Sequence, residues 1–110
     1  MDVVFIDPPW GQTFSQLMIA KMFAWNASHP ECPITKANVT LDHIRPKSMF
    51  MHIDEMPDCN HFTNLQPLPR SVNEQKGNLW GYSDEAYWRA HIFKNPVYKE
   101  VYLPRGLVLK

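Results

Sequence analysis

The sequence predicts an α+β domain, because helical and extended patterns alternate along a chain of only 110 residues. Thr13–Ala27 carries hydrophobic residues at spacings of three and four, which is typical of an amphipathic helix. Residues 39–42 form an extended pattern, and Ser71–Lys76 has the composition of a short helix that Gly77 would end. We therefore expect a strand followed by a short helix in the middle of the chain.

The other elements are expected at the two ends of the chain and in the intervening loops. Val3–Ile6 is an apolar run that predicts a strand stopped by two prolines. Residues 48–62 predict a long loop with at most a turn of helix, and residues 64–68 predict a turn. Ser83–Ile92 predicts a helix capped by its first serine, and residues 97–109 look extended.

Length and composition indicate one packed domain over residues 1–110. The chain is 45% hydrophobic and contains four tryptophans, which favours a folded core even though it also has ten prolines. We expect residues 1–30 to brace a core at 31–80, and 81–110 to form a helix with an extended segment. No apolar run approaches the roughly 20 residues that cross a bilayer, and the first residues lack the basic start of a secretion signal. We therefore expect a soluble, cytoplasmic protein.

The formal net charge is zero, which argues against tight nonspecific binding to DNA, because lysine and arginine supply that affinity. Acidic residues gather at 54–58, so charge could still be segregated in space. Each basic residue could equally be an ordinary solvated charge. Four basic residues are close in sequence to the motifs that follow: Arg45, Lys47, Arg70 and Lys76.

Three polar motifs follow one another between residues 42 and 78. Residues 42–46 read Asp-His-Ile-Arg-Pro, residues 64–68 read Asn-Leu-Gln-Pro-Leu, and residues 73–78 read Asn-Glu-Gln-Lys-Gly-Asn. A carboxylate beside a histidine, followed by two asparagines, supplies a hard oxygen ligand, a nitrogen base and two amides. Such a set predicts a hydrolytic site for phosphodiesters.

In this order the motifs resemble those of the HNH endonucleases, over about half of the chain, roughly Cys32–Trp80. The resemblance implies a small ββα-metal core, in which two antiparallel strands and a helix surround one metal ion. This core would be flanked by an N-terminal helix and by a C-terminal helix plus extended segment. His43 would end the first strand, Asn64 would lie in the turn region, and Asn73 would lie on the helix.

The resemblance also implies a role for each residue, and the chemistry of the side chains agrees with it. His43 would be the general base that takes a proton from water, so that hydroxide attacks phosphorus. Asp42 and the side-chain oxygen of Asn73 would bind Mg²⁺ or Mn²⁺. Asn64 would orient the His43 loop through backbone hydrogen bonds. The four basic residues named above would contact the nucleic acid.

The chain departs from the family pattern in two respects. Many members have a histidine in place of Asn73, and an amide oxygen shifts the metal preference towards Mg²⁺ or Mn²⁺ and away from zinc or nickel. The paired cysteines that brace many members are also missing. We therefore expect the flanking helices to hold the core by packing, with Trp25, Trp80 and Trp88 as the apolar brace.

Two other motifs suggest different chemistry. Residues 7–10, Asp-Pro-Pro-Trp, resemble the catalytic loop of DNA adenine methyltransferases, but the chain has only four glycines, no G-x-G, and too little length for a doubly wound domain. Cys32 and Cys59 lie far apart and form no close pair, so a structural zinc is less expected than reduced thiols.

Three functions from different classes remain open. The first is a metal-dependent DNA endonuclease or nickase of phage or mobile-element type, acting in the bacterial cytoplasm. The second is a catalytically silent module with the same fold, binding nucleic acid or inhibiting a host protein. The third is a structural zinc protein. With only four or five basic residues near the motifs, we expect weak, salt-sensitive binding to DNA unless a partner protein supplies more contacts.

Overall fold

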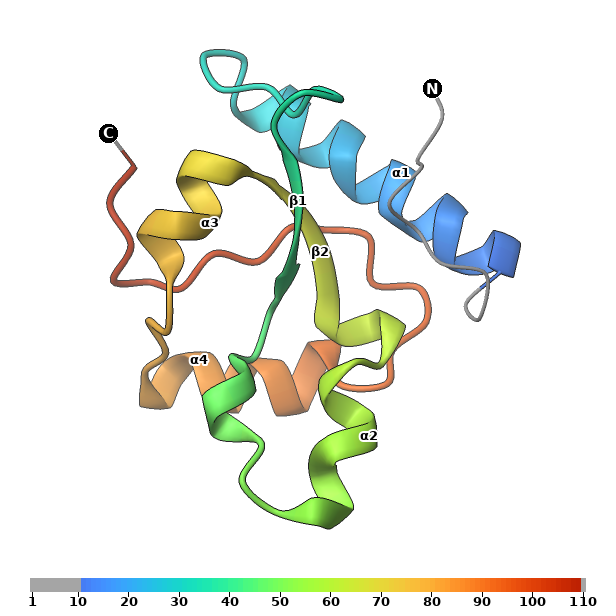
Figure 1. Ribbon diagram of the computed structural model, residues 1–110, viewed down its shortest axis with the longest axis vertical. Helices are drawn as coiled ribbons and strands as arrows, with labels where there is room; N and C mark the ends of the chain where they lie inside the picture. Colours follow the sequence, from blue (N-terminus) through green and yellow to red (C-terminus); the bar gives the residue numbers. More distant parts are fainter. Residues whose placement is uncertain (1–10, 110) are drawn as a thin grey trace.

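The computed structural model describes residues 11–109, with side chains from residue 16 onward, and it is an α+β domain. Figure 1 shows its helices arranged around one pair of short strands. The elements in chain order are α1 (Gly11–Ser28), β1 (Val39–His43), α2 (Met56–Cys59), β2 (Leu65–Pro69), α3 (Arg70–Lys76) and α4 (Tyr82–Tyr87). The last helix continues as a π-helical turn over Trp88–Ile92. Short 3₁₀ turns occur at Lys47–Met49, Ile53–Glu55 and Phe62–Asn64.

The strands β1 and β2 pair in a two-stranded antiparallel sheet whose register runs from Val39 opposite Pro69 to His43 opposite Leu65. We call this strand pair the hairpin, although a long segment connects its two strands. The sequence predicted β1, but it predicted a turn where β2 forms. Pro67 and Pro69 are tolerated because they lie two residues apart, so their nitrogen atoms, which carry no hydrogen, can both face the outer edge of a two-stranded sheet. The chain then enters α3 directly, which gives a strand–strand–helix unit.

The predicted N-terminal helix is confirmed as α1, which packs against β2. Met18 lies in a cluster with Leu65 at the start of β2, and Trp25 lies in a second cluster with Leu68 near its end. Val72 of α3 joins this second cluster, so α1 and α3 are fixed to the same strand. Figure 1 shows α1 and α3 on opposite sides of the hairpin.

A third cluster fixes the long segment that connects the strands. Ile44, Phe50 and Cys59 from this segment pack against Trp88, which follows α4. Trp80 is partly buried at the edge of the same cluster. The predicted aromatic brace is therefore divided, because Trp25 serves the α1 side and the other two serve the connecting segment. The predicted loop of residues 48–62 contains only short turns and α2, as expected.

The ends of α3 and α4 are set by individual residues. Gly77 ends α3 with a positive φ of 47°, in the left-handed region that favours glycine, which confirms the predicted stop. The prediction that Ser83 caps the next helix is wrong. The Gly81 N–H donates to Asp84 Oδ2 at 2.7 Å, so α4 begins one residue before that serine and Asp84 supplies the cap.

The C-terminal segment, residues 97–109, contains no regular strand, but it packs closely against the hairpin. Val101, Leu103, Leu107 and Leu109 pack against the cluster that contains Leu68. The expected strand at 3–6 and the Asp-Pro-Pro-Trp motif at 7–10 lie outside the described residues. Among residues 11–109, no helix is long and apolar enough to cross a membrane.

Candidate active site

A polar pocket of about 190 Å³ lies where the end of β1 meets α3. Four of the residues predicted from the sequence border it, namely Asp42, His43, Lys47 and Asn73. The rest of its lining comes from Leu41, Pro46, Gly77 and Asn78. The strand–strand–helix unit thus brings together residues that are 31 positions apart in the sequence, counted from Asp42 to Asn73.

The Asp42 carboxylate is buried, with only 5% of the residue exposed. Its Oδ1 lies 3.2 Å from Lys76 Nζ, and its Oδ2 accepts a hydrogen bond of 2.8 Å from Gln66 Nε2. Burial raises the pKa of the Asp42 carboxyl, while the Lys76 charge and the Gln66 hydrogen bond oppose that rise. A carboxylate has about four lone-pair sites, so each oxygen can accept a further ligand from the pocket.

Lys76 ties the two strand-end residues together from α3. Its buried ammonium pairs with Asp42 and also donates to the His43 carbonyl oxygen at 3.0 Å. The residue is 1% exposed, which corrects the expectation that Lys76 offers positive charge at the surface. It neutralises the Asp42 carboxylate instead, as a buried charge requires a partner.

His43 is half-buried and its ring is held by Asn60. His43 Nε2 lies 2.8 Å from Asn60 Oδ1. Because an amide oxygen only accepts, Nε2 carries the hydrogen in a neutral ring and Nδ1 is left with the free lone pair. The contact therefore selects the tautomer whose Nδ1 can take a proton.

Asn64 is buried and joins the two ends of the connecting segment. Its Oδ1 accepts hydrogen bonds from the Arg45 N–H at 2.8 Å and from Trp88 Nε1 at 3.0 Å. Its Nδ2 donates to the Cys59 carbonyl at 2.8 Å and, more weakly, to the Arg45 carbonyl at 3.3 Å. Its own carbonyl accepts from the Ile44 N–H at 2.7 Å. These bonds fix the backbone directly after His43.

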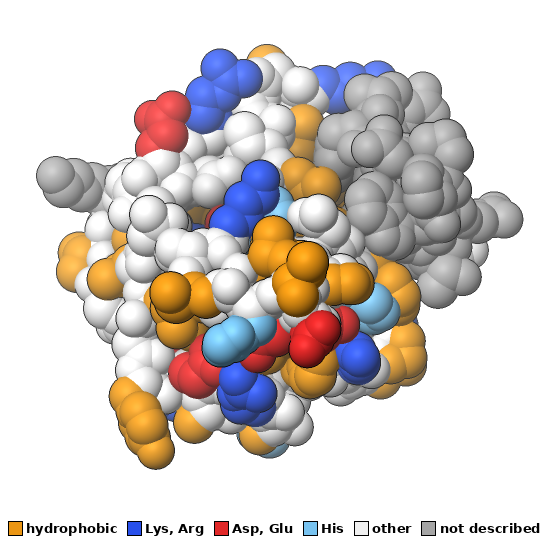
Figure 2. Space-filling view, turned by 60° about the horizontal axis from the view of Figure 1, so that its bottom comes forward, with side chains coloured by type: hydrophobic (Ala, Val, Ile, Leu, Met, Phe, Trp, Pro, Cys, Tyr) orange, Lys and Arg blue, Asp and Glu red, His pale blue; other side chains and the backbone are white. Residues whose placement is uncertain are grey.

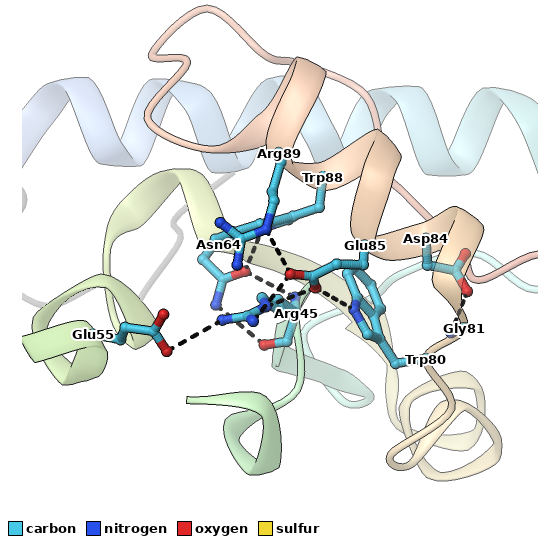
Figure 3. A network of polar contacts seen from close by, with 9 residues as sticks. All are labelled: Arg45, Glu55, Asn64, Trp80, Gly81, Asp84, Glu85, Trp88 and Arg89. Atoms are coloured by element: carbon cyan, nitrogen blue, oxygen red, sulfur yellow. Dashed lines mark hydrogen bonds and ion pairs between the residues drawn. The ribbon is translucent and has the colours of Figure 1, made fainter. Parts of the chain in front are cut away.

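Arg45 also belongs to the interior, and Figure 3 shows it at the centre of a polar network. Its Nε and Nη2 donate to the two carboxylate oxygens of Glu85 at 2.8 and 3.0 Å, and its guanidinium lies against the rings of Phe50 and Trp88. Burial alone would raise the pKa of Glu85, but the hydrogen bonds from Arg45, Trp80 and Arg89 lower it. Arg45 is 5% exposed, which corrects the expectation that it contacts nucleic acid at the surface.

The two remaining predicted basic residues are exposed. Lys47 borders the pocket, so its ammonium can approach a ligand bound there. Arg70 begins α3 at its far end from Gly77 and does not border the pocket. Of the four predicted phosphate contacts, Lys47 is therefore the one placed at this pocket.

Asn73 presents an amide to the pocket from α3. Its Nδ2 donates to Thr40 Oγ1 at 3.0 Å. Its Oδ1 accepts no hydrogen bond from any residue that the structure describes. A divalent metal ion is implied by the resemblance, and this oxygen together with the Asp42 carboxylate is a suitable donor set, because Mg²⁺ commonly takes one or two protein oxygens and completes its shell with water and phosphate.

The cysteines do not lie together in the fold. Cys32 and Cys59 are free thiols that lie in different hydrophobic clusters. Within residues 11–109, no group of three or more histidine, cysteine, aspartate or glutamate side chains could hold a metal ion.

Sequence reasoning missed three residues around the pocket: Thr40, Asn60 and Gln66. Thr40 and Gln66 could have been found from strand pairing, since Gln66 is opposite Asp42 and Thr40 shares the Asp42 face of β1. Asn60 lies in the connecting segment, whose path depends on packing against Trp88 and not on any local pattern.

The chain was also compared with known proteins. No protein-family model, curated protein or solved structure gives a significant match to it.

Proposed function

We propose that this protein is a metal-dependent endonuclease that hydrolyses DNA phosphodiester bonds. The observation that carries the proposal is the meeting of Asp42, His43 and Asn73 at one polar pocket, at the end of a strand–strand–helix unit. This arrangement agrees with what the three sequence motifs imply by their resemblance to HNH endonucleases.

The contact between His43 Nε2 and Asn60 Oδ1 favours the tautomer that suits His43 to act as the base. With Nε2–H directed at Asn60, Nδ1 takes a proton from a water molecule in the pocket. The water oxygen then bonds to phosphorus, the bond from phosphorus to the 3′ oxygen breaks, and the leaving oxygen takes a proton from solvent. Asn64 contributes by fixing the backbone that follows His43.

Asp42 and Asn73 would hold one Mg²⁺ or Mn²⁺ ion through oxygen atoms. A cation bound there would supply positive charge to the phosphate and to the leaving oxygen. The positive charge of Lys76 offsets the negative charge of Asp42, so the site should bind its cation weakly until phosphate oxygens complete the coordination shell of the cation. Lys47, exposed at the pocket, supplies a contact for a neighbouring phosphate.

The proposal is tested by incubating supercoiled plasmid with the purified protein in Mg²⁺, in Mn²⁺ and in EDTA. His43→Ala should abolish cleavage, whereas His91→Ala, at an exposed histidine that does not border the pocket, should cleave at the wild-type rate. Nicked or linear product that requires both metal and His43 is the expected result. Full activity of His43→Ala would contradict the mechanism, and no product in either metal would contradict the endonuclease proposal.

A second candidate rests on the surface of the connecting segment. Met51 and Ile53 are each 84% exposed and Met56 is 49% exposed, close in sequence to Asp54 and Glu55. On the face shown in Figure 2, hydrophobic side chains gather beside acidic ones. Exposed apolar residues of this kind suit a protein partner, and the acids disfavour nucleic acid. A module that binds a host protein without turnover is therefore the alternative if no cleavage is observed.

A further inference from the structure

Thr40 lies on β1, two residues before Asp42, and its hydroxyl has two partners. Thr40 Oγ1 donates to the Leu68 carbonyl oxygen across the hairpin at 2.8 Å. The same oxygen receives the hydrogen bond from Asn73 Nδ2 at 3.0 Å. The hydroxyl thus connects the β2 backbone with the side chain that α3 presents to the pocket.

The chemistry of these groups fixes the direction of both bonds. A hydroxyl has one hydrogen, and the Leu68 carbonyl can only accept, so the Thr40 hydrogen is committed to β2. Thr40 Oγ1 can then only accept from Asn73. The NH₂ group of Asn73 must face Thr40, and the other atom of the amide fork, Oδ1, must face away from it.

This orientation matters because the two ends of an amide are nearly equal in shape and opposite in polarity. An oxygen can bind a cation, whereas an NH₂ group repels it. Without a fixed partner, the amide of Asn73 would sample both orientations, and only the fraction with Oδ1 in the pocket could bind metal.

We propose that Thr40 is a positioning residue that makes Asn73 a metal ligand, because its committed hydroxyl holds the amide with the oxygen available to the cation. The inference rests on the proposed function and adds a determinant of metal affinity outside the three sequence motifs. Thr40 itself contacts neither the metal nor the substrate. Its effect passes entirely through the orientation of Asn73.

The test compares Thr40→Val, which keeps the branched shape and removes the hydroxyl, with Thr40→Ser, which keeps the hydroxyl. Mn²⁺ binding to the full chain is measured by electron paramagnetic resonance, and plasmid nicking is measured against Mn²⁺ concentration. Thr40→Val should weaken Mn²⁺ binding by at least about 2-fold, the loss expected when the freed amide divides evenly between its two orientations. The loss should not exceed roughly 100-fold, the upper range for residues that orient metal ligands. Thr40→Ser should remain close to wild type, and thermal melting in EDTA reports any loss of fold separately.

The same substitution in an Asn73→Asp background separates positioning from a general structural role. Both oxygens of a carboxylate accept, so no orientation remains to be selected, and Thr40→Val should then cause little further loss of Mn²⁺ affinity. An equal loss in both backgrounds, or wild-type binding by Thr40→Val, would overturn the inference while leaving the nuclease proposal intact. Failure of the wild-type protein to bind Mn²⁺ or to cleave would instead remove the proposed function, and this inference with it.

Discussion

Asn64→Ala should strongly destabilise the protein, because one buried amide holds the connecting segment closed. The alanine removes three well-formed side-chain bonds of 2.8 to 3.0 Å, to Arg45, Cys59 and Trp88, and one weaker bond. Two N–H groups and two carbonyl oxygens lose their bond to this amide, in a region where Asn64 is 1% exposed. Water cannot replace all of these contacts without opening the segment.

The expected loss follows from the cost of leaving buried polar groups unpaired. Each such group costs about 1 to 3 kcal/mol, and partial rehydration lowers the sum to roughly 3 to 5 kcal/mol. A domain of this size is typically stable by only about 5 to 15 kcal/mol, so the variant should lose a large fraction of its free energy of unfolding. Trp88→Phe removes one donor from the same network and also shrinks a buried ring, so it should cost about 1 kcal/mol for the hydrogen bond and roughly 1 to 3 kcal/mol more for the lost packing.

Urea denaturation followed by tryptophan fluorescence measures these losses. Asn60→Ala is the matched control, because Asn60 is exposed and, among residues 11–109, its side chain forms a hydrogen bond with His43 Nε2 alone. Its free energy of unfolding should stay within about 0.5 kcal/mol of wild type. If Asn64→Ala and Asn60→Ala unfolded at the same urea concentration, the role of Asn64 described above would be refuted.

Two further predictions concern buried lysines. Burial lowers the pKa of Lys21 from 10.5 to about 7, so between these pH values the unfolded chain binds a proton that the folded protein has released, and stability rises with pH. The urea midpoint should therefore increase from pH 7 to pH 9 in wild type and not in Lys21→Met; parallel increases would contradict this. Lys76→Met should cost roughly 3 to 5 kcal/mol at pH 7, because Asp42 loses its counter-charge, and exposed Lys47→Met should cost almost nothing. Since burial raises the pKa of Asp42, the Lys76→Met loss should shrink at pH 5, and an equal loss at both pH values would refute the pairing.

The sequence predicted the elements whose signals are local. The spacing of hydrophobic residues identified α1, and Gly77 marked the end of α3. The strand β2 was missed because its prolines discourage a strand, and only the position of its partner shows that they face a free edge. The N-cap of α4 is Gly81, two residues before the predicted Ser83. The Asp84 side chain, inside the helix, accepts the hydrogen bond from the Gly81 N–H.

The site was predictable to the extent that its residues share one motif order. Asp42, His43 and Asn73 border one pocket, which agrees with the arrangement that the resemblance to HNH endonucleases implies. Arg45 was expected to contact phosphate because it lies beside the motif residues in the sequence, and nothing local indicates a partner 40 residues away at Glu85. Pairings of this kind depend on tertiary packing, which motif spacing does not encode.

Gln66 gives the C-terminal segment a direct connection to the candidate site. Its Nε2 donates to Asp42 and to the Tyr102 carbonyl oxygen, and its Oε1 accepts from the Tyr102 N–H. The Tyr102 backbone therefore fixes the side chain of Gln66, and Gln66 in turn fixes the Asp42 carboxylate. A partner or a tag that pulled this segment away from β2 would remove two of the hydrogen bonds that hold Gln66, and would loosen Asp42 although the partner itself binds far from it in the sequence.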